Sequence, residues 1–254
     1  DDTVTIQAAI DAVETAGGGE VYFPVGTYRV QNLKARNNVL CRGAFGSVTL
    51  KVVDGVDKNI FHNPNQAIPT TVDYFGLEGL ILDGNATGVA GVTARSVCTC
   101  NGATYFYAKD CIFKDATGYG LGFQAYVNTP YTGAQSEIYL ENCHFNNNGV
   151  GVGAGDTYDG LDIKDCDRVT LVGCTATGNY DKGINIRGES VNITGGWCKS
   201  NLGSGYEFAG NNHGEAVATT LNISDIQAYS NGGAGLAVAD GYGIPTQTVR
   251  CNVS

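Results

Sequence analysis

Short stretches in which apolar residues alternate with small or polar ones recur along most of the chain, and polar or glycine-rich corners separate them. Such period-two alternation predicts β-strands that bury one face. One order of strand, polar corner, short strand, Asn/Gly corner and strand recurs in residues 107–123, 138–154, 169–186, 191–208 and 221–238. A unit of this length cannot bury its own apolar face, so the units are expected to stack around one continuous core.

Aligned on the first corner, the repeats place the following residues at equivalent positions: Cys111, Cys143, Cys174, Gly196 and Ile226. The unequal spacing of these positions predicts extra loops at residues 124–137, 155–168 and 209–220. We expect all three loops to leave the solenoid after the same strand and to project from one side. Insertions on one face of a repeat protein often form its binding face.

The pattern predicts an all-β fold, a right-handed parallel β-helix that forms one domain over residues 1–254. Residues 1–30 differ from the repeats and are expected to cap one end with a helix and the first strands. Asp2 is predicted to cap this helix, whose apolar face includes Ile6 and Ile10, and the glycines at 17–19 end it. Residues 248–254 look like the start of another strand, which predicts a longer intact protein.

Cysteine and asparagine recur at the corners of the repeat. The chain has nine cysteines, and we interpret Cys111, Cys143 and Cys174 as a ladder of buried, reduced thiols rather than disulfides. Cys98 and Cys100 share one strand face and are expected to pack in the core. The corner asparagines are expected to adopt the left-handed conformation that this residue tolerates, and they are Asn147, Asn148, Asn179, Asn201 and Asn231.

Composition limits the classes of molecule that the protein is expected to bind. The net charge is −10, which argues against binding nucleic acid through phosphate neutralisation. Only 16% of the residues are charged, so much of the surface is uncharged, polar and suited to hydrogen-bonding sugars. No apolar run is long enough to span a membrane. A protein that acts on extracellular polysaccharide is expected outside the cell, or on the surface of a cell or virion.

The opening segment DDTVTIQAAIDAVETAGGGEVYFPVGTYRV resembles the start of the pectate-lyase-3 type β-helices, which include polysaccharide lyases, phage tailspikes and bacterial mannuronan C5-epimerase modules. Three later segments resemble the epimerases in order and spacing: LEGLILDGN at 77–85, GYGLGFQ at 118–124 and NYDKGINI at 179–186. The resemblance implies a pectin-lyase-like solenoid that acts on a uronate polymer such as alginate.

The same resemblance implies where the reaction takes place. The epimerases carry the motif Tyr-Gly-Phe-Asp-Pro-His, and the matching stretch here begins with Tyr119. Gly122 stands at the Asp position, Gln124 stands at the His position, and no lysine follows the LDGN segment where the family has one. These departures favour a rival interpretation in which the protein binds glycan without modifying it, as a tailspike or adhesin does.

The third strand of each repeat is expected to point its apolar residues inward, including Leu121 and Phe123, Val150 and Val152, and Ile184 and Ile186. The outward positions are then Gly122, Gln124, Gly151, Gly153, Asn185, Arg187 and Glu207. This predicts a trough with a small-sided floor beside a polar patch, in which a polymer can lie. The alternative is that these glycines only permit tight turns and close stacking.

The segment GDTYDGLDIKDCDR is rich in aspartate. Asp156 and Asp159 are candidate ligands for Ca²⁺, which takes six to eight oxygens. Two of its carboxylates could instead form the acid and base of a glycosidase, with Asp159 and Asp162 as the pair. A solvated acidic loop is the third possibility. In an alternative register, DGLDIK is itself a floor strand with Asp162 and Lys164 outward.

Abstraction of the C5 proton of a uronate needs its carboxylate neutralised, and Lys164, Lys182 and Arg187 are the basic residues near the expected trough. Gln124 can assist by hydrogen bonding. Tyr119 can act as base or acid if a cation lies near it, and His213, in a loop beside the trough, is another candidate base.

We therefore expect an enzyme that acts on an extracellular uronate polymer by C5 proton abstraction, as an epimerase or a lyase. Asn185, Glu207, Lys164 and His213 are expected to bind the substrate. A glycosidase that uses the Asp-rich segment is the alternative enzyme, and a tailspike or adhesin is the non-catalytic one. No cofactor is required, although Ca²⁺ remains possible, and a monomer is expected unless the protein is a trimeric tailspike.

Overall fold

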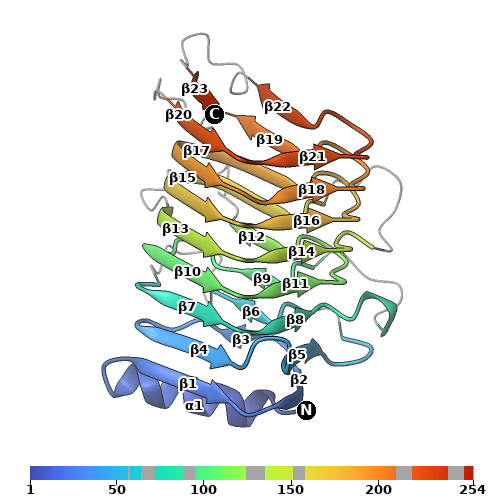
Figure 1. The fold of residues 1–254 in the computed structure, drawn as a ribbon. Helices are drawn as coiled ribbons and strands as arrows, with labels where there is room; N and C mark the ends of the chain where they lie inside the picture. The colour runs from blue at the N-terminus through green and yellow to red at the C-terminus, as the bar shows by residue number, and fades with distance from the viewer. Residues whose placement is uncertain are drawn as a thin grey trace, which may run out of the picture.

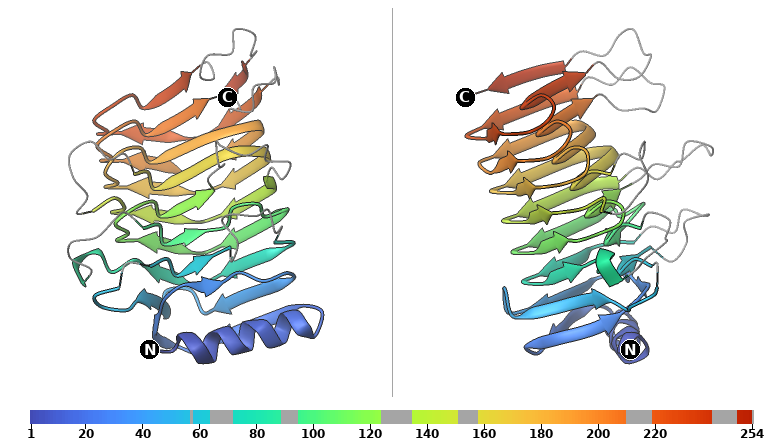
Figure 2. Two further views of the ribbon diagram at one scale, coloured as in Figure 1. Left: turned by 180° about the vertical axis from the view of Figure 1, so that it is seen from behind. Right: turned by 90° about the vertical axis from the view of Figure 1, so that its right-hand side faces the viewer.

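A computed structural model describes residues 1–56, 58–63, 72–88, 95–123, 135–150, 158–209, 219–239 and 249–253. The chain winds into a right-handed parallel β-helix, and every strand pairing in the described residues is parallel (Figure 1). Each turn contributes a first, a second and a third strand, which confirms the predicted fold class. Figure 2 shows the turns stacked along one axis, with the two termini at opposite ends.

The first strands form one face of the stack. They are β1 (Gly19–Phe23), β4 (Val39–Gly43), β7 (Phe75–Glu78), β10 (Tyr105–Lys109), β13 (Gln135–Glu141), the ends of β15 (Leu161–Val172) and β17 (Ile184–Thr194), β20 (Thr219–Ser224) and β23 (Val249–Val253).

The second strands form a separate sheet. They are β2 (Gly26–Val30), β5 (Val48–Val52), β8 (Ile81–Asp83), β11 (Ile112–Lys114), β14 (His144–Asn146), β16 (Thr175–Thr177), β18 (Trp197–Lys199) and β21 (Gln227–Tyr229). A short 3₁₀ helix, η1 (Ala86–Gly88), follows β8.

The third strands form the face on which the candidate site lies. They are β3 (Leu33–Lys34), β6 (Phe61–His62), β9 (Cys98–Thr99), β12 (Leu121–Phe123), the beginnings of β15 and β17, β19 (Tyr206–Ala209) and β22 (Leu236–Ala239). Because β15 and β17 run on from the third strand of one turn into the first strand of the next, they join the two faces into one sheet.

Helix α1 (Thr3–Thr15) lies across the N-terminal end of the stack and buries Ile6 and Ile10, so the predicted cap is confirmed (Figures 1 and 2). Its start differs from the expectation. Asp2 occupies the N-cap position, but its side chain makes no capping bond and accepts a hydrogen bond from the Arg29 N–H at 2.8 Å. The Asp1 carboxylate accepts from the Thr3 N–H instead. No helix in the described part of the chain is long and apolar enough to cross a bilayer.

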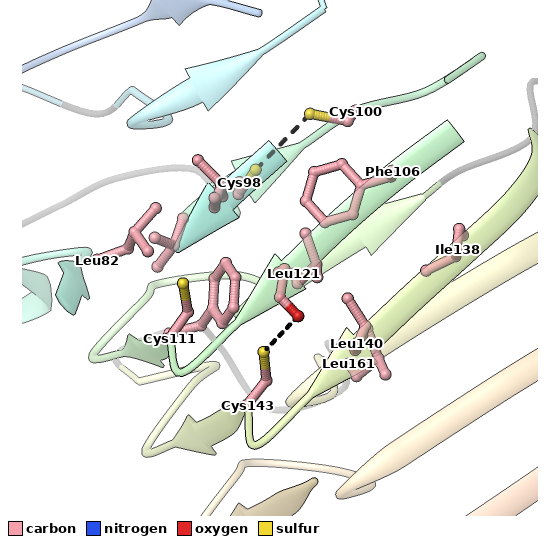
Figure 3. Close-up of a cluster of buried hydrophobic side chains, with 14 of the residues drawn as sticks. Leu82, Cys98, Cys100, Phe106, Cys111, Leu121, Ile138, Leu140, Cys143 and Leu161 are labelled. Atoms are coloured by element: carbon pink, nitrogen blue, oxygen red, sulfur yellow. Dashed lines mark hydrogen bonds between the residues drawn. The ribbon is translucent and has the colours of Figure 1, made fainter. Parts of the chain in front are cut away.

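The interior of the stack is a continuous apolar core to which the cysteines contribute. Eight of the nine cysteines lie within the described residues whose burial is known, and all eight are buried free thiols. Figure 3 shows Cys98, Cys100, Cys111 and Cys143 among leucine, isoleucine and phenylalanine side chains. The Sγ atoms of Cys98 and Cys100 lie 3.8 Å apart, too far for a disulfide. This agrees with the predicted ladder of reduced thiols.

The corner between the second and third strands holds a buried asparagine ladder. The Nδ2 of Asn148 donates to Oδ1 of Asn179 at 2.9 Å, and the Nδ2 of Asn179 donates to Oδ1 of Asn201 at 2.8 Å. Asn201 continues the ladder to Asn231 at 2.9 Å. Among the five asparagines predicted to be left-handed, only Asn147 has a positive φ. The prediction was wrong for the other four, because their amides satisfy the backbone of neighbouring turns while the preceding residue makes the bend.

The register of one turn also differs from the leading expectation. Leu161 and Ile163 pair with Leu121 and Phe123, so DGLDIK is the third strand of its turn, as the alternative register proposed. Val150 is 40% exposed rather than a core residue. Residues 151–157, which include Gly151, Val152 and Gly153, lie outside the described residues. This insertion therefore comes before the third strand, not after it as expected, whereas residues 124–134 and 210–218 follow third strands.

Candidate functional site

The outward positions of the third strands form a continuous row, which we call the floor. From the N-terminal end, its pairings place these residues in register: Lys34, His62, Thr99, Gly122, Asp162, Asn185, Glu207 and Ala237. Their strand neighbours alternate into the core, since Leu161 and Ile163 are fully buried on either side of Asp162. Small side chains were predicted over two turns of the floor. Gly122 fits this prediction, but the next turn carries Asp162 in register with it.

Lys164 connects the floor to an aromatic pair. Its Nζ lies 3.1 Å from Oδ2 of Asp162 and 5.8 Å from the centroid of the Tyr119 ring. Tyr119 meets Tyr158 edge to face, with the ring centroids 5.1 Å apart. Asp162 is only 1% exposed, whereas the Lys164 side chain is 23% exposed. The ammonium group and the tyrosine pair, rather than this carboxylate, are therefore the groups that a ligand meets.

Lys182 organises a second cluster on the next turn. Its Nζ lies 2.7 Å from Asp181, 3.9 Å from Asp159 and 4.0 Å from Glu207. Burial lowers the pKa of Lys182, but the carboxylates of Asp159, Asp181 and Glu207 raise it, and the net shift is upward. The lysine therefore stays cationic within a cluster of acidic groups.

Asp159 accepts a hydrogen bond on each carboxylate oxygen and is 2% exposed. Its Oδ1 accepts the backbone N–H of Lys182, and its Oδ2 accepts from Nδ2 of Asn185, both at 2.9 Å. Burial and the neighbouring Asp162 raise the pKa of Asp159 to about 7, against the opposing effect of Lys182. Asp159 can thus hold or release a proton near neutral pH, which is the property that acid–base catalysis requires.

The structure brings most of the predicted site residues together. Tyr119, Lys164 and Asp162 form one contact group, and Lys182, Asp159, Asn185 and Glu207 form the adjacent one. Arg187 follows Ile186, the partner of Ile163, so it lies at the same end of the floor as Lys164. Gln124, Asp156 and His213 lie outside the described residues.

The described residues give no support to the predicted calcium site, and its other proposed ligand, Asp156, lies outside them. Both carboxylate oxygens of Asp159 already accept N–H donors, and no group of three or more His, Cys, Asp or Glu in the described ranges could hold a metal ion.

His62 is a floor residue that the sequence did not indicate. It lies three positions along the row from Asp162, roughly 14 Å at the usual strand spacing. Burial lowers its pKa, and its Nδ1 lies 2.8 Å from the Asn63 carbonyl oxygen. The short strand FH carries too little alternation to reveal its register, so its outward position could not be predicted from sequence.

The comparisons with known proteins agree with this architecture. The sequence profile of the family described as "Right handed beta helix region" matches residues 56–253. Mannuronan C5-epimerase AlgE3 of Azotobacter vinelandii is 29% identical over 96% of this chain, which covers 12% of that protein. Alginate lyase 7 of the same organism is 39% identical over 36% of this chain, which corresponds to 12% of the lyase.

A solved structure shares the fold. The A-module of Azotobacter vinelandii mannuronan C-5 epimerase AlgE6 superposes with a TM-score of 0.68 at 23% identity, over 98% of this chain and 64% of that one. This chain thus spans only a small part of the curated relatives that it matches. The resemblance that the opening segment and the later motifs predicted is confirmed.

Proposed function

The chain belongs to the right-handed β-helix family, and from that premise we propose that it acts on a uronate-containing polysaccharide that lies along the floor. The observation that carries this proposal is the contact between Lys164 and Tyr119 beside Lys182 and Asp159. The similarity to mannuronan C5-epimerases and to an alginate lyase supports the choice of polymer.

The first step of the proposed reaction is neutralisation of the substrate carboxylate by the cations near the floor. Lys164 and Arg187 lie on the first two floor strands that follow Gly122, and Lys182 lies in the corner two residues before the second of these strands. The three cations can there face the carboxylate of a bound uronate. Their positive charge stabilises the negative charge that develops on this carboxylate when the C5 proton leaves. Glu207, whose side chain is 26% exposed, extends the same face and can accept hydrogen bonds from sugar hydroxyl groups. Asn185 is buried beside it and donates to Asp159, so its proposed role is to position that carboxylate rather than to contact the sugar.

Proton transfer then needs a base and an acid. A cation beside a tyrosine stabilises its phenolate, so Tyr119 next to Lys164 is the proposed base that takes the C5 proton. The electron pair of the broken C–H bond passes into the carboxylate. In an epimerase, an acid returns a proton to the opposite face of C5. In a lyase, the electron pair forms the C4–C5 double bond, and the O4 leaving group receives the proton.

A glycoside hydrolase is the second candidate, and the neighbouring carboxylates of Asp159 and Asp162 favour it. A pKa of about 7 lets Asp159 act as the acid, while Asp162, paired with Lys164, can serve as the ionised partner. Both carboxylates are buried, however, so the side chains around them, among them Lys164 at Asp162 and Lys182 at Asp159, would have to move for them to reach a sugar. The exposed groups therefore favour C5 chemistry.

The test compares two tyrosines that each carry a lysine over the ring. Wild-type protein is incubated with polymannuronate and polygalacturonate, and ultraviolet absorbance, reducing ends and the C5 configuration by NMR are followed. We expect a change at C5 that Tyr119→Phe reduces by roughly 100-fold or more, as loss of a general base does. Tyr229→Phe is the matched control, since Lys199 lies 5.5 Å from the Tyr229 ring on the second-strand sheet, and it should keep full activity.

Other outcomes point elsewhere. Reducing ends without a double bond would establish the hydrolase, and equal activity of the two phenylalanine variants would remove Tyr119 from the reaction. Binding without any chemical change would identify a glycan-binding protein of the tailspike or adhesin kind. The proposal places the chain outside the cell, where such polymers occur, acting as a monomer unless the tailspike interpretation holds.

A further inference from the structure

A cavity of about 520 Å³ lies on the first-strand sheet, away from the floor. It opens on β1, β4, β7 and β10, which are neighbours at the N-terminal half of the stack (Figure 1). Its lining is made by Gly19, Glu20, Asn38, Val39, Leu40, Tyr74, Phe75, Gly76, Tyr105 and Tyr107. None of the floor residues takes part, so the cavity has no role in the chemistry proposed above.

Three tyrosines give the cavity its aromatic wall. Tyr74 and Tyr105 lie with ring centroids 5.3 Å apart, and Tyr107 stacks on Tyr139 at 6.0 Å. Tyr74 is 60% exposed and has a φ of 56°. Asn38, at the same corner one turn earlier, has a φ of 58°, so this left-handed bend belongs to the solenoid. At this bend Tyr74 places an exposed ring at the rim of the cavity.

Gly76 leaves an open space between the side chains of Leu40 and Tyr107. In the register of the sheet it lies between Leu40 on β4 and Tyr107 on β10, and it contributes no side chain. A Cβ atom added there would lie 2.9 Å from Cδ1 of Leu40 and 3.5 Å from Cδ1 of Tyr107. Any larger side chain would consequently fill the hollow between them.

The charges around the cavity select against an acidic ligand. None of its described lining residues is a lysine or an arginine, and Glu20 is the single charged one. The cations nearby already have partners, since Arg42 lies 3.3 Å from both Glu20 and Glu78, and Lys109 lies 3.0 Å from Glu141. A uronate carboxylate would meet negative charge here, whereas a sugar hydroxyl can donate to Glu20.

We propose that this cavity binds a pyranose ring of a neutral polysaccharide, at a site separate from the floor. The apolar C–H face of such a ring packs on the tyrosines, and its hydroxyl groups reach Glu20 and the amide of Asn38. Aromatic walls with a few placed polar groups are the usual composition of a small-ligand pocket. The chain would thus bind an acidic glycan on the third-strand face and a neutral glycan on the first-strand face.

The experiment uses native gels of the full chain that contain hydroxyethyl cellulose, dextran or galactomannan, with polymannuronate as the acidic comparison. We expect at least one neutral glycan to retard the wild-type protein. Tyr74→Ala and Gly76→Val should each weaken that binding roughly ten-fold or more, the first by removing ring contact and the second by filling the hollow.

Two controls separate this site from others. Tyr22→Ala removes a tyrosine that is 58% exposed on the same sheet but does not line the cavity, and it should bind as the wild type does. Lys164→Met alters the floor and should also leave neutral-glycan binding unchanged. The proposal is overturned if no neutral glycan retards the protein, if only polymannuronate does, or if Tyr22→Ala weakens binding as much as Tyr74→Ala.

Discussion

The side chain of Lys164 serves two neighbours at once, the carboxylate of Asp162 and the ring of Tyr119. Asp162 holds the ammonium group in position, and the positive charge of this group lies over the Tyr119 ring. The Lys164 side chain is 23% exposed, whereas that of Asp162 is 1% exposed. In the proposed reaction, this lysine is the group that contacts both the buried carboxylate and the sugar.

Replacing this lysine tests its charge. Lys164→Met is expected to lower kcat/KM on a uronate polymer roughly 10- to 100-fold, because a charge-assisted hydrogen bond to the substrate carboxylate is lost. Lys199→Met removes the corresponding cation over Tyr229 on the second-strand sheet and should leave kcat/KM unchanged. Steady-state kinetics of both variants supply the measurement. Equal kinetics in the two variants would show that Lys164 does not contact the substrate.

Asp159 makes stability depend on pH. Its ordinary pKa is 3.8, and burial and Asp162 raise it to about 7 in the fold. Between these values the folded chain keeps a proton that the unfolded chain has released, so the free energy of unfolding falls as pH rises, by about 1.4 kcal/mol per pH unit.

Asp159→Asn should remove this slope. The new amide can donate to Asn185 Oδ1, which has no hydrogen-bond partner among the described residues, once the Asn185 amide turns over. Urea unfolding at intervals across the window measures the effect, with Asp181→Asn as the control that should keep the wild-type slope. A slope that survives in Asp159→Asn would place the titrating group elsewhere.

At the scale of the element, the asparagine ladder holds successive turns in register. Asn148 and Asn179 are fully buried, and each donates through Nδ2 to the next ladder residue. Asn179 also receives the backbone N–H of Asn148 on its Oδ1. Removal of one such amide leaves several buried polar groups on two neighbouring turns without their partner.

Asn179→Ala is therefore expected to lower the free energy of unfolding by about 3 kcal/mol or more, since each buried group left unsatisfied costs about 1–3 kcal/mol. Asn222→Ala is the matched control, because Asn222 donates to Asn192 at 2.8 Å on a partly exposed face. It should cost about 1 kcal/mol or less. Chemical denaturation of both variants gives the comparison, and similar losses would contradict a special role for the buried ladder.

The sequence predicted the elements well wherever their alternation was strong. The strands of the aligned repeats, the N-terminal helix and the equivalence of Cys111, Cys143 and Cys174 all follow from local pattern. The turn around DGLDIK was ambiguous, because GVGVGA offers an equally regular alternation just before it. Only pairing with Leu121 and Phe123 on the neighbouring turn decides between the two registers.

Contacts between neighbouring turns also limited how much of the site could be predicted. Asn185 and Glu207 were predicted as outward residues because their strands alternate clearly. The contacts of Lys182 with Asp159 and Glu207 join three turns and cannot be read from any one of them. His62 was missed because its strand has only two residues. Burial of Asp162 beneath Lys164 also has no sequence signal, since outward positions on strands are ordinarily exposed.

At the scale of the whole molecule, the solenoid separates two surfaces of different character. Cations and buried carboxylates lie on the third strands and in the corners that precede them, whereas the aromatic cavity lies on the first strands. Because the turns stack rigidly through parallel pairing, both surfaces run along the helix axis, in the direction that a linear polymer would take (Figure 2). The fold thus suits the handling of long chains rather than of small molecules.

The central claim is that the floor supports removal of the C5 proton from a uronate. The most direct measurement is incubation of the full chain with polymannuronate in heavy water, followed by NMR of the recovered polymer. We expect deuterium at C5 of inverted residues, or C4–C5 double bonds at new chain ends, in the wild type and not in Tyr119→Phe. A polymer recovered with every C5 proton in place and no double bonds would contradict it.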